Sequence, residues 1–222
     1  MIIALDGPSG TGKSTLAKLL ASSLNFKMLN TGMIYRAITY YFYNLGIFSD
    51  NTMEIIKRIK ELKIEIIFDN QNQNVHIDGI DITPYVSNPE VQQNVSLYSS
   101  ILEIRQFVTK IQREYAKTNN VIIEGRDIGT EVFPNADIKF YVTCDTTVRA
   151  KRRLADLQKL NQSISLEEVI DSLEKRDYLD KTRKYGPLRR ADDAIDIDTS
   201  NSTIDESLNE MLGCIKTTKQ TK

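Results

Sequence analysis

A glycine-rich segment near the start of the chain constrains the fold more than any other feature. Residues 7–14 read Gly-Pro-Ser-Gly-Thr-Gly-Lys-Ser and match the pattern G-x-x-x-x-G-K-[ST] in full. The apolar run before this segment predicts a buried strand over residues 1–5, and leucines on one face predict a helix over residues 15–24. A strand, a glycine-rich turn and a helix in this order are typical of an α/β domain whose first turn binds phosphate.

The glycines of this segment allow successive backbone N–H groups to turn inward around a triphosphate. The positive end of the dipole of the following helix strengthens the same anion site. Lys13 is expected to reach the β- and γ-phosphates, and the hydroxyl of Ser14 is expected to ligate Mg²⁺. The residues predicted to bind the triphosphate are Gly7, Pro8, Ser9, Gly10, Thr11, Gly12, Lys13, Ser14 and Thr15.

Length and composition predict one globular domain. A chain of 222 residues can form one buried core and an insertion, and 41% hydrophobic and 27% charged residues are ordinary values. The formal net charge of −1 gives no overall attraction to nucleic acid, so an acidic substrate must be held by local arginines or lysines. Cys144 and Cys214 lie far apart and predict two reduced core thiols rather than a disulfide or a zinc site.

No apolar run approaches the length needed to span a membrane, and the first residues are expected to form a core strand rather than a cleaved signal. We therefore expect a cytoplasmic protein with no membrane partner.

Strands and helices alternate along most of the chain, which predicts a three-layer α/β fold with a five-stranded parallel sheet. The five strands are expected at residues 1–5, 26–30, 121–123, 138–142 and 194–198. Helices are expected at residues 15–24, 33–44, 51–63, 90–117, 164–180 and 204–215, with a basic helix after Asp145. Residues 217–222 are polar and are expected to be a frayed tail.

Residues 64–86 do not follow this alternation. Short strands are expected at residues 64–68, 74–77 and 81–83, separated by turn-forming residues. Closely spaced strands with tight turns predict a small antiparallel insert.

Arginines gather where the parallel strands would end, which is where an open parallel sheet binds its ligand. A planar guanidinium can bind phosphate oxygens through two hydrogen bonds and stays charged. One group of arginines is expected to hold the phosphate of an acceptor, and another to stabilise charge on the transferred group. These arginines are Arg36, Arg126, Arg149, Arg152, Arg153, Arg176 and Arg183.

The position of the single histidine bears on the nature of the acceptor. His76 falls in the antiparallel insert, away from the strand ends. An alcohol acceptor would call for a general base near the glycine-rich turn, whereas a phosphate acceptor is already anionic at pH 7. Asp6 is a candidate base, but a role in the water shell of Mg²⁺ or in a loop contact is an equal alternative. The pattern favours a nucleoside monophosphate as acceptor.

Four segments resemble those of bacterial cytidylate kinases, and the resemblance extends over nearly the whole chain. The segments are Asp-Gly-Pro-Ser-Gly-Thr-Gly-Lys-Ser-Thr at 6–15, Thr-Gly-Met-Ile-Tyr-Arg at 31–36, Glu-Gly-Arg-Asp-Ile-Gly-Thr at 124–130, and Arg-Asp-Tyr-Leu-Asp at 176–180. The second and third are far more specific than the glycine-rich turn. The resemblance implies a P-loop kinase that transfers the γ-phosphate of ATP to CMP or dCMP with Mg²⁺, acting as a monomer.

The resemblance also implies three functional parts. A core is expected at about residues 1–30, 118–148 and 184–222, and a monophosphate-binding region at about 31–117 that contains the insert at 64–86. A mobile lid is expected at about 149–183, and its closure around residues 150–165 would exclude water from the reaction.

Residue roles follow from the resemblance position by position. Thr31, Arg36 and Arg126 would contact the acceptor and grip its phosphate, Ser96, Arg105 and Asp127 would face the cytosine, and Arg176 and Asp180 would reach the sugar. The residues expected to act in catalysis are Lys13, Arg36, Arg126, Arg149 and Arg153, and which lid arginine contacts the transferred phosphate stays open. Two positions depart from the common pattern: Asn30 stands where an acid is frequent, and Thr31 where serine also occurs.

The chemistry of cytosine agrees with these assignments. The amino group at N4 can donate to the carboxylate of Asp127, and the guanidinium of Arg105 can donate to N3 and O2. Uracil presents O4 in place of the amino group, so it would face a carboxylate with no proton between the two oxygens.

Simpler interpretations remain for several of these residues. Arg176, Asp180 and Arg183 share one helix face, which also describes an exposed ladder of ion pairs. Arg105 could flank the buried face of its helix, and Ser96 could be incidental.

Arg152 and Arg153 could be solvated, and at least one of them is expected to be. The aromatic residues at 40–43 are expected to pack rather than to stack on a base.

Three other functions are compatible with a phosphate-binding loop. The first is a small-molecule kinase for UMP, AMP or a non-nucleotide, which a panel of acceptors would separate. The second is a GTPase-like switch, which would carry an N-K-x-D segment that this chain lacks. The third is an ATPase stimulated by nucleic acid, which the near-zero net charge disfavours.

Overall fold

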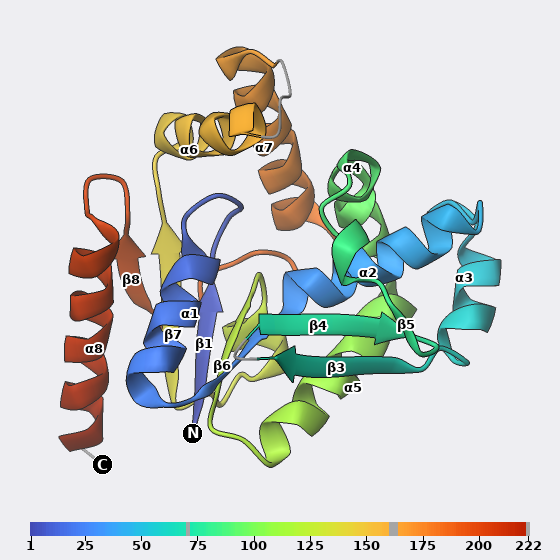
Figure 1. Ribbon diagram of the computed structural model, residues 1–222. Helices are drawn as coiled ribbons and strands as arrows, with labels where there is room; N and C mark the ends of the chain where they lie inside the picture. The colour runs from blue at the N-terminus through green and yellow to red at the C-terminus, as the bar shows by residue number, and fades with distance from the viewer. Residues whose placement is uncertain (70–71, 160–163, 221–222) are drawn as a thin grey trace. The chain divides into compact units, whose positions relative to one another are not determined.

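Five parallel strands form the central sheet, in the order β2-β6-β1-β7-β8 (Figure 1). The structure is a computed structural model that describes residues 1–69, 72–159 and 164–220. The strands are β1 (Ile2–Asp6), β2 (Lys27–Asn30), β6 (Val121–Gly125), β7 (Ile138–Thr143) and β8 (Ile195–Asp198). The runs in β1 and β6 are almost wholly buried, as expected for strands with both faces covered. The predicted five-stranded parallel sheet is confirmed.

The chain divides into two compact units. The first contains residues 1–28, 120–183 and 187–222, and the second contains residues 29–119 and 184–186.

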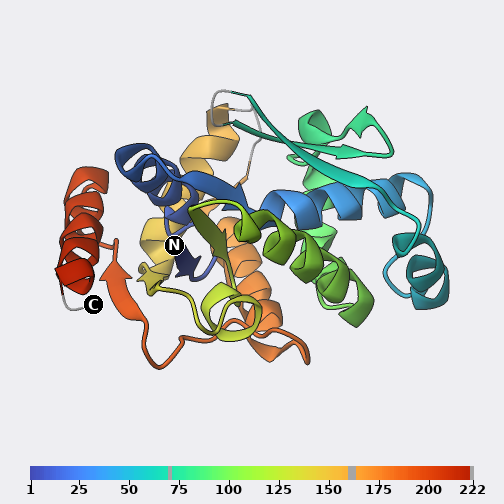
Figure 2. The same ribbon diagram turned by 90° about the horizontal axis from the view of Figure 1, so that it is seen from below.

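In the first unit, α1 (Lys13–Leu24) and α8 (Ile204–Gln220) lie side by side against the sheet (Figures 1 and 2). Leu16 and Leu20 of α1 pack with Phe140 of β7 and Met211 of α8 in the main core of this unit. The leucine face predicted for the first helix is therefore its buried face.

The helices α6 (Thr146–Lys159) and α7 (Leu166–Thr182) pack against each other in the same unit. They share a small core of Ala150, Val169 and Leu173, separate from the main core. A capping box begins α7, in which Ser165 and Glu168 exchange side-chain and backbone hydrogen bonds. Residues 160–163, part of the segment predicted to close as a lid, lie outside the described residues.

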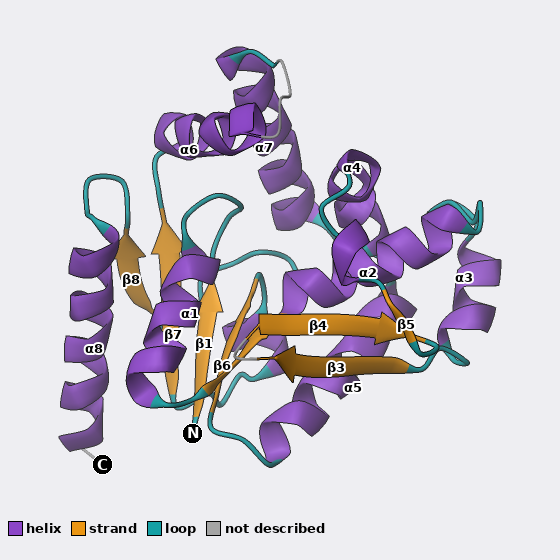
Figure 3. Cartoon of the chain, viewed as in Figure 1, coloured by secondary structure: helices purple, strands orange, loops and turns teal. Residues whose placement is uncertain are grey.

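The second unit combines helices with a three-stranded antiparallel sheet in the order β3-β4-β5 (Figure 3). Its strands are β3 (Ile64–Asp69), β4 (Asn72–Ile77) and β5 (Ile80–Asp81). Its helices are α2 (Thr31–Asn44), α3 (Thr52–Ile59), α4 (Pro89–Tyr98), α5 (Leu102–Lys117) and the short η1 (Thr83–Tyr85). Asp78 and Gly79 take positive φ in the turn between β4 and β5, as a tight hairpin requires. The predicted antiparallel insert is confirmed.

The single helix predicted over residues 90–117 is wrong. The structure has two helices, α4 and α5, separated at Ser99 to Ile101. The hydroxyls of Ser99 and Ser100 donate to the carbonyls of Ser96 and Leu97, three residues back, and so compete with helix continuation. Ile101 is extended, which breaks the helix before α5 begins.

Other boundaries also differ from the sequence-based expectations. The predicted strand at 81–83 ends at Asp81, because Thr83 and Pro84 begin η1. The tail expected to fray from residue 217 is helical to Gln220, and the hydroxyls of Thr217 and Thr218 donate to carbonyls one turn back. Residues 221–222 of that tail lie outside the described residues.

The aromatic residues of α2 pack against other rings of the second unit, as predicted. Phe42 is fully buried and stacks on Tyr98, and Tyr40 stacks on Tyr85 with ring centroids 4.6 Å apart.

Cys144 and Cys214 are unpaired, as expected, but both are partly exposed rather than buried in the core. Within the described part of the chain, the helices fall short of the length and apolar character that crossing a membrane requires.

Gly7 supports a prediction about stability. It follows β1 with φ of 148°, and a Cβ atom there would overlap the carbonyl oxygen of Val142 in β7. We expect Gly7→Ala to lower the free energy of unfolding by about 2–5 kcal/mol, measured by urea denaturation. Gly213→Ala is the matched control, because no atom lies within 4 Å of a Cβ at this exposed helical position. The control should be neutral or stabilising by up to about 1 kcal/mol, and equal effects of both substitutions would contradict the prediction.

Candidate functional site

The glycine-rich segment forms a loop that leaves the carboxyl end of β1 and leads into α1. Gly10 and Gly12 take positive φ values of 79° and 85°, which glycine adopts without strain. The sheet order changes direction at β1, which lies between β6 and β7. Ligands of open α/β sheets bind at such a switch point, outside the carboxyl ends of the strands. The loop therefore stands where the topology predicts an anion site.

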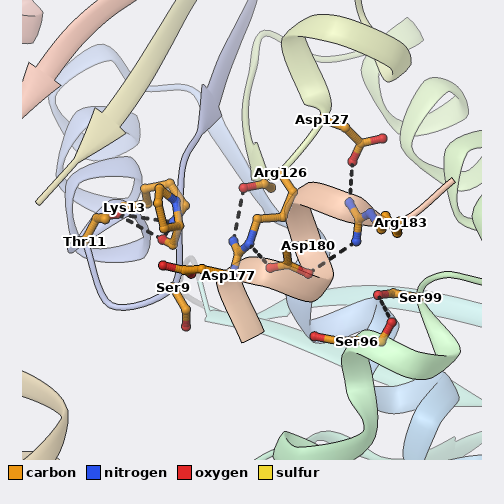
Figure 4. Close-up of polar contacts among 12 residues, drawn as sticks. Ser9, Thr11, Lys13, Ser96, Ser99, Arg126, Asp127, Asp177, Asp180 and Arg183 are labelled. Carbon is orange, nitrogen blue, oxygen red and sulfur yellow. Dashed lines mark hydrogen bonds and ion pairs between the residues drawn. The ribbon is translucent and has the colours of Figure 1, made fainter. Parts of the chain in front are cut away.

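The ammonium group of Lys13 contacts its own loop. Its Nζ donates to the carbonyl oxygen of Pro8 and lies 3.3 Å from Oγ1 of Thr11 (Figure 4). The Lys13 side chain is buried, so these two oxygens satisfy a charged group that burial would otherwise penalise. A bound phosphate would compete with these two oxygens for the N–H donors of Lys13.

Two groups of this site titrate close to neutrality. Burial and, to a smaller extent, the nearby Arg126 lower the pKa of Lys13 to about 7. Burial raises the pKa of Asp6, the last residue of β1, to about 7, against two backbone N–H groups that favour its ionised form.

Asp6 fixes the segment that follows β6. Its two carboxylate oxygens accept from the backbone N–H groups of Ile128 and Gly129, at 2.9 and 2.7 Å. These donors open the short helix η2 (Ile128–Val132). Of the alternatives for Asp6, the structure shows the loop contact.

Ser14 and Glu124 supply oxygen atoms at the start of α1 and the end of β6. The hydroxyl of Ser14 donates to the carboxylate of Glu124, with distances of 2.8 and 2.9 Å to its two oxygens. Hydroxyl and carboxylate oxygens are the hard ligands that Mg²⁺ prefers, so this pair fits that ion. Within the described ranges, no group of three or more His, Cys, Asp and Glu side chains could hold a metal by itself. A metal here would need further ligands from phosphate and water.

Arg126 is held by a carboxylate from α7. Its Nε donates to Oδ2 of Asp180 at 2.8 Å, and both side chains are largely buried (Figure 4). Burial opposes ionisation of Asp180, but Arg126, Arg176 and Arg183 outweigh it and hold the pKa of Asp180 below its usual value. The alternative interpretation of this face of α7 as an exposed ladder is therefore wrong, because the side chains of Asp180 and Arg183 are buried in a charged network.

Asp127 lies beside the same network. One of its oxygens is 3.6 Å from the guanidinium of Arg183, which is also 3.5 Å from Asp180. Arg183 follows α7 directly, and 5% of its side chain is exposed. Arg183 is among the arginines expected at the strand ends, but the position-by-position assignment gives it no role, although it lies seven residues after Arg176 on the same helix face.

Arg149 spans three segments of the first unit. Its NH1 donates to the carbonyl of Ser9 in the glycine-rich loop and to Oδ2 of Asp177 on α7, at 3.0 and 2.7 Å. Its NH2 donates to Thr146 at the start of α6. Both members of the Arg149–Asp177 pair are buried. The pair therefore links the loop to both helices of the predicted lid.

The neighbouring arginines differ from Arg149. Arg152 is exposed, yet its NH2 donates to the carbonyl of Thr199 after β8, and Arg153 is partly exposed on α6. The hydroxyl of Thr199 donates to the carbonyl of Thr11, so the segment after β8 also supports the loop.

In the second unit, Thr31 begins α2 and Arg36 lies five residues further along the same helix. Thr31 is 2% exposed, and Arg36 is partly exposed. A Cβ atom on Gly32 would meet NH1 of Arg36 at 3.0 Å and Oδ1 of Asn30 at 3.2 Å, so the guanidinium lies directly over this glycine. The N-terminus of α2 and the guanidinium together form a cationic surface.

Ser96 and Arg105 belong to the same unit. Arg105 is 5% exposed on α5, donates from NH1 to the carbonyl of Ser99, and lies over the ring of Tyr35 at 5.7 Å from its centroid. Arg105 is therefore buried among its partners rather than at the flank of its helix. Ser96 is 8% exposed on α4, and its carbonyl accepts from Ser99.

The structure thus brings together the predicted residues within each unit. In the first unit, Arg126 and Arg176 lie close enough to Lys13 to lower its pKa, and Asp127 and Asp180 share Arg183. In the second unit, the predicted residues occur at the start of α2 and on α4 and α5: Thr31, Arg36, Ser96 and Arg105.

Comparison with known protein families gives one match over nearly the full chain. The family model described as cytidylate kinase matches residues 3–217. A cytidylate kinase of Fusobacterium nucleatum is 40% identical over 209 residues, which cover 94% of this chain and 94% of the relative. A cytidylate kinase of Clostridium tetani is 38% identical over 218 residues, covering 98% and 95%.

Solved structures match in fold at low sequence identity. A protein of Eubacterium ventriosum described as uncharacterized has a TM-score of 0.54 and 13% identity, covering 97% of this chain and 98% of the other. A gluconokinase from Sinorhizobium meliloti has a TM-score of 0.50 and 10% identity, covering 99% and 94%. At this identity the likeness concerns the fold alone.

The lowered pKa of Lys13 predicts proton uptake when a nucleoside triphosphate binds. At pH 8 most Lys13 side chains are neutral, since their pKa is about 7, and an anionic phosphate favours the ammonium form. Binding at pH 8 should therefore take up about one proton per site, and affinity should fall as pH rises above 7. Calorimetry in buffers of different ionisation enthalpy measures this uptake.

Lys13→Met should reduce the proton uptake, whereas Lys18→Met should leave it unchanged, because Lys18 is exposed on the same helix. Equal uptake by the wild type and the Lys13 variant would refute the prediction.

The buried Arg149–Asp177 pair predicts a second effect. Asp177→Ala leaves a buried guanidinium without its carboxylate, so we expect it to cost about 3–5 kcal/mol of unfolding free energy. Asp196→Ala removes the partner of Arg190 in an exposed pair and should cost less than about 1 kcal/mol. Urea denaturation of both variants tests the difference, and a cost for Asp177→Ala no larger than the control would count against a buried pair.

Proposed function

The chain belongs to the cytidylate kinase family, and on that premise we propose how it transfers the γ-phosphate of ATP to CMP or dCMP. One observation carries the proposal: Lys13, Arg126 and Arg176 come from three separate segments and interact electrostatically. Three cations gathered at the phosphate-binding loop call for a polyanionic ligand. Two nucleotides that meet at their phosphates would supply that charge.

The donor site would use the glycine-rich loop. The backbone N–H groups of residues 7–15 would surround the triphosphate of ATP, and Lys13 would exchange its contact with Pro8 for the β- and γ-phosphates. Ser14 would ligate Mg²⁺ together with phosphate oxygens, and the carboxylate of Glu124 would accept a hydrogen bond from the Ser14 hydroxyl. The ion would screen the charge of the phosphates during transfer.

The acceptor needs no general base. A monophosphate oxygen is already anionic at pH 7, so catalysis reduces to in-line positioning and stabilisation of charge. The contacts of Asp6 agree with a structural role for this residue, since its two oxygens hold the backbone N–H groups of Ile128 and Gly129.

Arginines would grip the acceptor phosphate and stabilise the transferred group. Arg36 and Arg126 would hold the acceptor phosphate, and Thr31 would contact it from the start of α2. Asp180 supports this role for Arg126, because the ion pair fixes the guanidinium before a ligand arrives. Of the lid arginines, we favour Arg153 at the transferred phosphate, since NH1 of Arg149 is engaged by Ser9 and Asp177.

Cytosine would be read by hydrogen bonds. Asp127 would accept from N4, Arg105 would donate to N3 and O2, and Ser96 would contact the same base. Arg183 would brace Asp127, since its guanidinium lies 3.6 Å from the carboxylate.

Arg176 and Asp180 would bind the sugar. For both residues, contact with the sugar is part of this proposal and comes from the resemblance of the segment at 176–180.

The setting of the reaction is also part of the proposal. The chain carries residues for both the donor and the acceptor, so we propose that it acts as a monomer. Its substrates are cytoplasmic metabolites, which supports a cytoplasmic location. Closure of a lid built on α6 and α7 would exclude water and suppress hydrolysis of ATP.

A panel of acceptors tests the proposed function. With ATP and Mg²⁺, release of ADP should be fastest with CMP and dCMP and much slower with UMP and AMP. Asp127→Asn should narrow the preference for CMP over UMP by at least about tenfold, because the amide can donate to O4 of uracil. A coupled assay of kcat/KM for each acceptor measures both effects.

Glu131→Gln is the matched control, because Glu131 is an exposed acid that pairs with Arg189. Preference of the wild type for UMP or AMP would make the protein a different kinase, and unchanged discrimination by Asp127→Asn would remove the base-reading role.

A further inference from the structure

Gln73 is a polar residue in an apolar row of β4. Gln73, Val75 and Ile77 alternate along the strand and share one face, and all three are buried. Val75 and Ile77 are apolar, as that face requires, and β4 packs on α2. A carboxamide in this row needs hydrogen-bond partners, because a buried amide without them costs stability.

The partners of Gln73 are both backbone atoms of one residue. Its Oε1 accepts from the N–H of Asn30 at 2.7 Å, and its Nε2 donates to the carbonyl of Asn30 at 3.1 Å. The carboxamide thus pairs with Asn30 as a neighbouring strand residue would. Among the twenty side chains, only glutamine and asparagine can donate and accept through such an amide.

Asn30 ends β2 and is the N-cap of α2. Its Oδ1 accepts from the N–H of Met33 at 3.0 Å and caps the helix. A Cβ atom on Gly32 would lie 3.2 Å from this Oδ1 and 3.0 Å from NH1 of Arg36, so both groups lie near the same glycine. The position of Asn30 therefore sets the first turn of α2, the helix that carries Thr31 and Arg36.

We infer that Gln73 is a positioning residue for the acceptor phosphate, acting through the backbone of Asn30 on Thr31 and Arg36. The inference rests on the acceptor site proposed above and gives the antiparallel insert a part in it. Without the carboxamide, the N–H and carbonyl of Asn30 lose their fixed partners and the cap on α2 can shift. A shift of the cationic surface at the start of α2 would weaken the hold on a phosphate dianion and leave the contacts to the base unchanged.

The test compares ligands with and without the phosphate. Gln73→Met keeps the length of the side chain and removes both hydrogen bonds. We expect the dissociation constant of CMP to rise about tenfold, and that of cytidine, which lacks the phosphate, to change less than about twofold. In kinetics, KM for CMP should rise while KM for ATP stays within about twofold. Calorimetry and the coupled assay measure the two sets of constants.

Asn74→Ala is the matched control, since Asn74 precedes Val75 on the opposite face of β4. It should leave the affinities for CMP and cytidine unchanged. If Gln73→Met does not fold, Gln73→Glu carries the same comparison, because it keeps the size of the side chain and loses the donor to the Asn30 carbonyl.

Equal weakening of CMP and cytidine would reveal a merely structural role and overturn the inference, as would unchanged binding of CMP. If the wild type phosphorylates CMP and Gln73→Met has the same KM and dissociation constant for CMP, this inference is overturned and the proposed function is not. A wild type that fails to phosphorylate CMP overturns the proposed function and this inference with it.

Discussion

The carboxylate of Asp6 is the contact on which the rest of the candidate site depends. It ends β1, is buried, and accepts two backbone N–H groups from the segment that follows β6. That segment also carries Arg126 and Asp127. The side chain of Asp6 therefore fixes these two residues relative to the glycine-rich loop that follows β1. Burial raises the pKa of Asp6 to about 7, which shows how far its surroundings exclude water. In such surroundings each further charge needs a partner, and Arg126, Arg149 and Arg183 have carboxylate partners.

Pairing of buried charges also orients the guanidinium groups of the first unit. Arg126, Arg149 and Arg183 are each paired with a carboxylate of α7, and Arg183 also lies near Asp127. A guanidinium that is already oriented loses little side-chain entropy on binding, which favours affinity for charged groups. The same pairing ties these arginines to α7, so a movement of that helix would displace several guanidinium groups together.

Much of this arrangement can be predicted from the sequence, and the reasons for the misses are physical. The glycine-rich loop, the parallel strands and the antiparallel insert follow from periodicity and turn residues, which are local signals. The break between α4 and α5 was missed because Ser99 and Ser100 act through hydrogen bonds that hydrophobic periodicity does not register. Local patterns also do not register contacts between residues distant in sequence. Such contacts join Arg149 to Asp177, Arg183 to Asp127, and Gln73 to the backbone of Asn30. Burial of the charged face of α7 could not be read from spacing, since an exposed ladder has the same spacing.

The bond between the Lys13 ammonium and the Pro8 carbonyl has a consequence for which anions can enter the loop. A chloride or sulfate ion offers one centre of charge, so its few contacts alone must offset the loss of the bond between Lys13 and Pro8. A chain of linked phosphates offers several centres at once and gains from all the loop amides together. The internal bond therefore favours polyphosphates over single small anions, because a ligand with several contacts to the loop offsets its loss more readily.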